Sequence, residues 1–163
     1  MMLQSIRQAI FLFFILFTFI LSHPTATWSA DLDYLSVNSD VIVFGKTLET
    51  QCLWAETSLN ILTHTTFQVE RCVKGQIDSG DTVIIETYGG TINGMKQKVS
   101  NVPTFQGGNY ALVFLTSGSN GRYYVVQDKE GMIPFANEKG KPLKQKGKGL
   151  SHMIQDVNLA LGK

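Results

Sequence analysis

The residues of this chain that could carry acid–base chemistry are few and scattered. His64 lies in residues 63–66, whose composition is typical of a solvent-facing strand, and His152 lies where a helix is expected to begin. A nucleophilic triad needs a base near its nucleophile. The sequence contains no serine-hydrolase motif, metalloprotease motif or phosphate-binding loop. Glu70 and Glu86 fall on different expected strands, where solvated strand faces account for both. We therefore predict a protein without catalytic activity, cofactor or metal.

Two groups of residues could instead contact a partner. Residues 138–149 carry five lysines, a composition that is typical of a solvated linker but also suits an acidic surface such as a lipid headgroup or a polyanion. These candidate interaction residues are Lys139, Lys141, Lys144, Lys146 and Lys148. Tyr123 and Tyr124 must point to opposite faces of their strand, and the exposed one could form an aromatic platform with Trp54 or Tyr88.

The first thirty residues are typical of a secretory signal peptide. Arg7 provides a positive start, residues 9–21 are almost entirely apolar, and small residues lead to Ala30. This apolar run is shorter than the roughly 20 residues that a membrane-spanning helix needs. We predict cleavage after Ala30, with Ser29 and Ala26 as alternative ends. The product is expected to be secreted or periplasmic and to have no transmembrane anchor.

The composition that remains after cleavage argues against nucleic acid as a partner. Removing residues 1–30 takes away Arg7, one of 14 basic residues, and leaves 13 basic against 13 acidic residues in the remaining 133. Nucleic-acid binders rely on a clear basic excess. A chain of this length suits one domain. The expected partner is another extracytoplasmic protein or an envelope component.

The two cysteines of the chain, Cys52 and Cys72, make a disulfide possible. An even number of cysteines outside the cytosol favours a bridge, and their spacing lacks the pairing of a structural zinc site. A simple hairpin of residues 41–54 and 61–73 would, however, place Cys52 opposite His64 and Cys72 opposite Phe44. The thiols would then be about 26 Å apart, whereas a bridge needs Cα atoms within about 7 Å.

Two arrangements of the cysteines therefore remain open. Residues 51–62 could form a long loop that allows the bridge, or the hairpin could be tight and leave the thiols free or paired between chains. We favour the bridge because of the expected compartment.

The pattern from Asp40 to Phe135 predicts short strands separated by turns. Residues 41–44 are apolar, residues 65–73 alternate, residues 82–88 follow a turn, and residues 110–116 are the most apolar segment of the mature chain. Further strands are expected at residues 122–127 and 132–135. Asn93-Gly94 is a strong hairpin signal. The candidate structural turns and bends are at Gly75, Gly89, Gly90, Gly94 and Gly107.

The end of the chain is predicted to be helical. Leu150, Ile154, Val157 and Leu161 follow helical spacing, and Ser151 is a plausible N-cap. A helix this short is marginal alone, so we expect its apolar stripe to dock on the β domain.

The order of these segments resembles a group of secreted bacterial proteins of unassigned function. The resemblance rests on residues 39–46, on a strand ending in Lys74-Gly75, on Gly89-Gly90, on residues 103–107 and on the strand 111–115. More distantly, the order is similar to the netrin-type module of tissue inhibitors of metalloproteinases, which is an OB-like barrel. The six or seven short strands by themselves indicate a small antiparallel barrel or sandwich. The resemblance implies an OB-like barrel, so we expect a mainly β fold of this kind with a C-terminal α-helix.

The inhibitory mechanism of that module does not carry over with the fold. The metalloproteinase inhibitors present a cysteine at the mature N-terminus to the protease zinc, whereas this mature chain is expected to start at Asp31 and has its first cysteine at Cys52.

We therefore expect a signal peptide over residues 1–30, the barrel over 31–136, a Lys/Gly-rich linker over 137–149 and the docked helix over 150–163. The function expected for it is binding or protein interaction. The alternatives are protease inhibition through a barrel edge or a loop such as residues 100–108, and polyanion or envelope-surface binding through residues 139–148.

Overall fold

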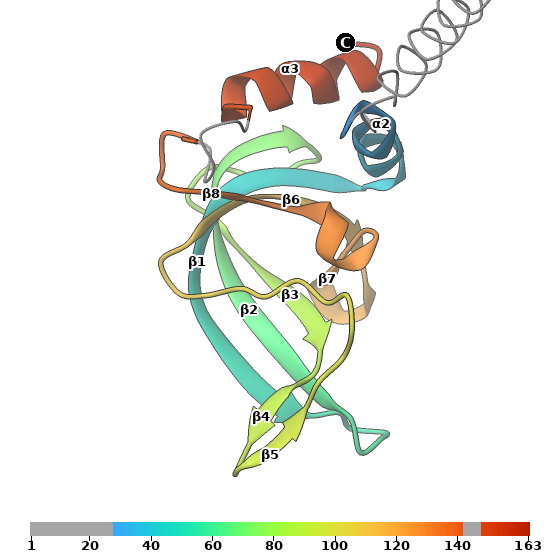
Figure 1. Ribbon diagram of the computed structural model, residues 1–163, viewed down its shortest axis with the longest axis vertical. Coiled ribbons are helices and arrows are strands. Elements are labelled where there is room, and N and C mark those ends of the chain that lie inside the picture. The colour runs from blue at the N-terminus through green and yellow to red at the C-terminus, as the bar shows by residue number, and fades with distance from the viewer. Residues whose placement is uncertain (1–27, 142–147) are drawn as a thin grey trace, which may run out of the picture.

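Strands dominate the structure, and a helix ends it. The computed structural model describes residues 28–141 and 148–163 (Figure 1). The mainly β fold class and the C-terminal helix are confirmed, but the described residues contain eight strands in place of six or seven. The strands are β1 (Val41–Trp54), β2 (Ile61–Lys74), β3 (Thr82–Tyr88), β4 (Gly90–Ile92), β5 (Met95–Gln97), β6 (Tyr110–Ser117), β7 (Arg122–Val125) and β8 (Met132–Phe135). The helices are α2 (Trp28–Asn38) and α3 (Leu150–Ala160), with short 3-10 turns η1 (Ser119–Gly121) and η2 (Asp128–Gly131).

The main sheet returns to its own first strand. Its order is β1-β2-β3-β7-β6-β8, and β1 also pairs with β6, while β4 and β5 form a separate pair. Five strands therefore make a closed ring of pairings. Strand direction cannot alternate all the way around a ring with an odd number of members, so one pair must be parallel. That pair is β3 with β7, where Ile84 lies opposite Arg122, and the expected all-antiparallel arrangement is wrong at this point.

The first hairpin is tight, and this separates the two cysteines. Cys52 lies opposite Thr63, and Cys72 lies opposite Val43. Nine residues of β1 thus separate the two positions, which corresponds to about 30 Å. Both cysteines are free thiols. The bridge that we favoured from the compartment is therefore a wrong prediction, because residues 51–62 do not form the long loop that it required.

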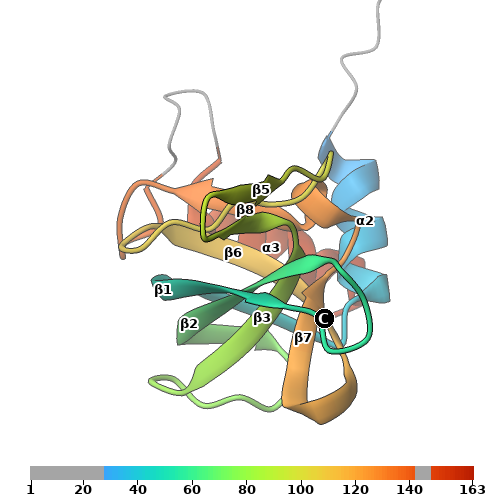
Figure 2. The ribbon, with the colours of Figure 1, turned by 90° about the horizontal axis from the view of Figure 1, so that it is seen from below.

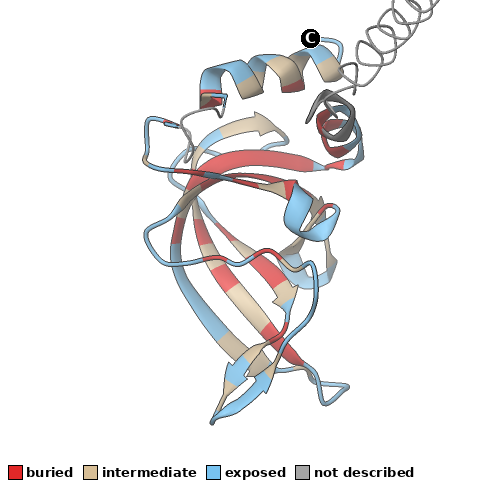
Figure 3. Ribbon diagram, viewed as in Figure 1, coloured by how far each residue is buried: buried red, intermediate tan, exposed pale blue. Residues whose placement is uncertain are grey.

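Two apolar cores lie on opposite sides of the strands. The inner core fills the ring and includes Phe67, Val69, Ile85 and Val113. The second core lies outside the ring on β1 and β6, where the helices cover it; its strand members are Ile42, Phe44, Leu112, Phe114, Ile133 and Phe135, and its helix members are Leu32, Leu35, Leu150 and Val157. Seen from the β4–β5 end (Figure 2), α3 lies behind β6, with α2 to one side of the sheet. The buried segments concentrate on β1 and β6 beneath the helices and along β2 and β3 (Figure 3).

Helix α2 is an element that the sequence pattern did not predict. The expected signal boundary after Ala30 falls within its first turn, whereas the apolar run of residues 9–21 lies outside the described residues. Lys74 Nζ donates to the carbonyl oxygens of Ser36 at 2.9 Å and Val37 at 3.3 Å. A cation at a helix C-terminus satisfies carbonyls that have no partner in the helix, so Lys74 holds the end of α2 to β2.

Most of the glycines expected at turns and bends have the backbone conformation that favours glycine. Positive φ angles occur at Gly75, Gly89, Gly90 and Gly94, whereas at Gly107 the positive φ belongs to the next residue, Gly108. At Gly94, φ is +81° directly after Asn93 at +49°, as a two-residue hairpin turn requires. At Gly90, an added Cβ would lie 2.6 Å from Cys52 Sγ, so only glycine lets β4 approach the first hairpin so closely.

Candidate functional site

A buried carboxylate lies at the centre of one face of the sheet. The side chain of Glu86 is only 8% exposed. Its Oε2 accepts hydrogen bonds from His64 Nε2 at 2.8 Å and Arg122 Nη1 at 2.9 Å, and its Oε1 accepts one from Tyr124 Oη at 3.2 Å. We call these four residues the Glu86 cluster. The interpretation of His64 and Glu86 as solvated strand residues is therefore wrong.

Strand register brings the four side chains together. His64 lies directly opposite Glu86 in the β2–β3 ladder, so the two share a face. The parallel β3–β7 pair sets Ile84 opposite Arg122. Since side chains two residues apart on a strand share a face, Arg122 and Tyr124 both project beside Glu86. The cluster therefore depends on the one parallel pair of the ring.

Among the described residues, no helix packs on the face that carries the cluster. We call it the open face; its residues on β2, β3 and β7 are Leu62, His64, Thr66, Gln68, Thr82, Ile84, Glu86, Tyr88, Arg122 and Tyr124. In the described residues, α2 and α3 pack instead on the outer side of β1 and β6, which we call the covered face. The open face is thus the side of the ring that this part of the chain leaves accessible.

Charges within the Glu86 cluster balance. The Arg122 guanidinium compensates the Glu86 carboxylate, and a neutral His64 ring can donate from Nε2 while its other ring nitrogen accepts. The pKa of the Tyr124 phenol is raised, first by burial and then by the Glu86 charge and hydrogen bond. Glu86 therefore accepts three hydrogen bonds, and its main effect is to fix the orientation of three neighbouring side chains.

Aromatic residues extend the open face beyond the cluster. Tyr88 lies opposite Leu62, two residues from Glu86, and its side chain is exposed. It is close enough to contribute to the raised pKa of Tyr124. Tyr123 points the other way and packs against the inner core. Trp54 is partnered with Ile61 and so lies on the opposite side of the hairpin from Leu62. Of the residues considered for an aromatic platform, only Tyr88 and Tyr124 lie on the open face.

Neither cysteine thiol belongs to the Glu86 cluster. Cys52 contacts Thr63 Oγ1 at 3.4 Å on the other side of the hairpin, and the Cys72 thiol donates to the carbonyl of Lys74 at 3.3 Å. Within the described residues no group of three or more His, Cys, Asp or Glu side chains is placed to hold a metal ion. The interactions that the structure shows for the four side chains of the cluster are the hydrogen bonds to Glu86.

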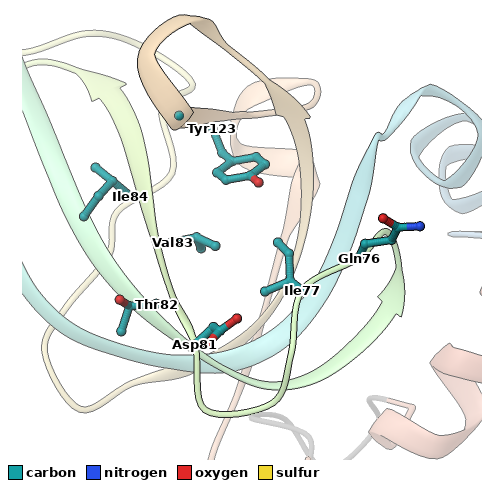
Figure 4. Close-up of a pocket in the computed structure, with 8 residues that line it drawn as sticks. Gln76, Ile77, Asp81, Thr82, Val83, Ile84 and Tyr123 are labelled. Atoms are coloured by element: carbon teal, nitrogen blue, oxygen red, sulfur yellow. The ribbon is translucent and has the colours of Figure 1, made fainter.

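A shallow pocket of about 410 Å³ lies where the β2–β3 loop meets the start of β7. Figure 4 shows Ile77, Val83 and Tyr123 directed toward its interior, with Asp81 at one edge and Ile84 pointing away. The pocket opens widely to solvent and borders the inner core, to which Val83 belongs. It contains none of the Glu86 cluster.

Other candidate residues lie apart from the open face. Lys139, Lys141 and Lys148 are exposed, and Lys148 Nζ pairs with Asp156 at 2.6 Å, whereas Lys144 and Lys146 lie outside the described residues. His152 is exposed on α3. Glu70 lies near Tyr110, which is across β1 from β2. The pKa of Tyr110 is raised, first by burial of the tyrosine side chain and then by the Glu70 charge.

The loop suggested for protease inhibition has a structural role. Within residues 100–108, Phe105 is buried in the inner core and packs edge-on against Phe67, with ring centroids 6.3 Å apart. This loop is therefore anchored to the interior at its centre.

Comparison with known proteins does not assign the site. No helix in the described part of the chain is long and apolar enough to cross a membrane. The chain matches no protein-family model, and no curated protein is significantly similar to it.

Proposed function

We propose that this protein is a secreted or periplasmic binding module without catalytic activity, built on an OB-like barrel. The closed ring of five strands with one parallel pair supports the barrel, because OB-folds are five-stranded Greek-key barrels. Their second and third strands form the face that binds ligands. In this chain β2 and β3 occupy those positions, and they carry His64 and Glu86.

One observation carries the proposal: a buried, charge-balanced network lies on the face that no described helix covers. A buried ion pair is weak evidence for stability, since desolvation offsets much of its attraction. A hydrophobic face with a third helix would stabilise the fold at least as well. The network instead holds Arg122, His64 and Tyr124 in fixed orientations at an accessible surface, which is the arrangement that recognition of a partner requires.

Photo-crosslinking in the native host tests the proposed surface. A benzophenone amino acid in place of Tyr88, which is 56% exposed on the open face, should give a covalent adduct with an extracytoplasmic component. Tyr34 on α2 is the matched control, because it is 50% exposed and lies away from this face. Adducts of equal yield from both positions, or from neither, would contradict the proposed surface.

A second measurement tests the absence of catalysis. A screen with hydrolase substrates should find no turnover that His64→Ala abolishes. Turnover that depends on His64 would contradict the proposed absence of catalysis and show that the protein is an enzyme.

A further inference from the structure

The open face is nearly neutral, and this constrains what it can bind. Its ionisable side chains on β2, β3 and β7 are the four of the Glu86 cluster and Tyr88, and within these Glu86 is paired with Arg122 at 2.9 Å. On the adjoining part of β1, Gln51 lies opposite His64, Glu49 lies opposite Thr66, and Lys46 lies opposite Gln68, so the two charged residues there are of opposite sign. A polyanion or nucleic acid needs several unpaired cations along its contact surface. The open face presents none.

The same face retains unused hydrogen-bonding groups. Arg122 donates a hydrogen bond from Nη1 to Glu86. Its side chain is 34% exposed, so its other N–H groups are available to a ligand. His64 uses Nε2 as a donor, and the second nitrogen of the neutral ring can accept a hydrogen bond. The Tyr124 hydroxyl donates its hydrogen bond to Glu86, and its oxygen can still accept one from a ligand. Fixed donors and acceptors therefore lie within one small area.

An exposed aromatic ring adjoins these groups. Tyr88 follows Glu86 by two residues on the same strand face, so its ring lies about 7 Å further along β3. Aromatic rings offer a flat apolar surface, with a polar tip that suits a hydrated ligand. The combination is an apolar platform beside pre-oriented hydrogen-bonding groups, of which the cation, Arg122, is paired with Glu86.

We infer that the open face binds a neutral oligosaccharide chain, a ligand that is rich in hydroxyl groups and has apolar ring faces. Sugar hydroxyls both donate and accept, as the mixture of Arg122, His64 and Tyr124 requires, and a pyranose ring can lie flat on Tyr88. OB-folds as a class include oligosaccharide binders on this strand pair. The inference rests on the proposed function and names its ligand class. A protein partner is the competing outcome.

Affinity electrophoresis tests the inference. The mature protein is run in native gels that contain dextran, galactomannan or glucomannan, and its pull-down by insoluble peptidoglycan is measured in parallel. At least one of these glycans should bind it. Tyr88→Ala should weaken that binding about tenfold, Tyr88→Phe should preserve it, and His64→Leu should weaken it without changing the circular dichroism spectrum. Tyr34→Ala is the control and should bind as the unmodified protein does.

The outcomes distinguish failure of the oligosaccharide inference from failure of the proposed binding surface. Binding that is unaffected by Tyr88→Ala, or lost equally in Tyr34→Ala, would overturn the site. No binding to any of these glycans, together with a specific protein adduct from position 88, would overturn the oligosaccharide inference and leave the proposed binding surface standing. No glycan binding and no adduct would overturn both.

Discussion

The two outer faces of the strand ring differ in what lies on them. The covered face, on β1 and β6, presents Ile42, Phe44, Leu112 and Phe114 to α2 and α3. The open face, on β2, β3 and β7, carries a buried, paired carboxylate and exposes a tyrosine to solvent. Strands that are apolar on both sides must be covered on both sides, whereas alternating strands can leave one face accessible. The difference therefore separates the part of the sheet that stabilises the fold from the part that is free to bind.

The largest expected effect is a loss of stability on the covered face. Phe114→Ala removes a fully buried ring beneath the helices and should lower the free energy of unfolding by about 3–5 kcal/mol. Thr66→Ala on the open face should lower it by about 0.5 kcal/mol or less. Urea unfolding followed by circular dichroism measures both. Equal losses would show that the two faces contribute alike to stability.

A smaller loss is expected when the Glu86 cluster is broken. Glu86→Ala leaves Arg122, His64 and Tyr124 without their acceptor and should lower the free energy of unfolding by about 1–3 kcal/mol. This figure lies below that for a fully buried pair because Arg122 is partly exposed. Glu86→Gln retains an oxygen acceptor and should cost less than Glu86→Ala. A loss as large as that of Phe114→Ala would mean that the cluster serves the fold first.

The helical cover itself gives the next test. Lys74→Met removes the two hydrogen bonds to the last turn of α2 and should lower the free energy of unfolding by about 1 kcal/mol. Hydrogen exchange should then accelerate in α2 and stay unchanged in β2 and β3. Acceleration across the open face would contradict the separation between the two faces.

Much of the covered face could be predicted from sequence, because its strands are uninterrupted apolar runs. Residues 41–44 and 110–116 read as buried strands, and the helical spacing of Leu150 and Val157 indicated a docked helix. Helix α2 gave no such signal: among its residues 32–38 the buried apolar ones are Leu32 and Leu35, and contacts with the rest of the fold stabilise it.

The Glu86 cluster could not be predicted, because its register depends on a loop that folds back. Val69 N donates to the Asp81 carbonyl, and Gly80 N donates to the Val69 carbonyl, so residues 75–81 return along the end of β2. β3 consequently pairs with residues 62–68, and His64 meets Glu86. A symmetric hairpin about the same turn would set His64 beyond the end of β3. The parallel pairing of β3 with β7 then places Arg122 beside Glu86, and no local sequence pattern predicts that pairing.

The smallest expected effect is an alkaline loss of stability that distinguishes the two faces. The folded-state pKa values of Tyr124 and Tyr110 are both raised above 10.0, in each case first by burial. Below pH of about 10 the folded and unfolded states both hold the phenol proton, so the contribution of each tyrosine is complete. As the pH rises through the folded pKa, the unfolded state has already released its proton, and the free energy of unfolding falls.

Tyr124→Phe should remove the part of that fall that belongs to the open face, and Tyr110→Phe should remove the other part. Glu86→Gln sharpens the comparison, because loss of the Glu86 charge should move the pKa of Tyr124 down toward its usual value while leaving that of Tyr110 unchanged. Ultraviolet titration of tyrosinate in the three variants measures this directly. A shift of Tyr110 in Glu86→Gln would mean that the faces are electrostatically coupled through the sheet, and a Tyr124 that does not shift would place its perturbation in burial alone.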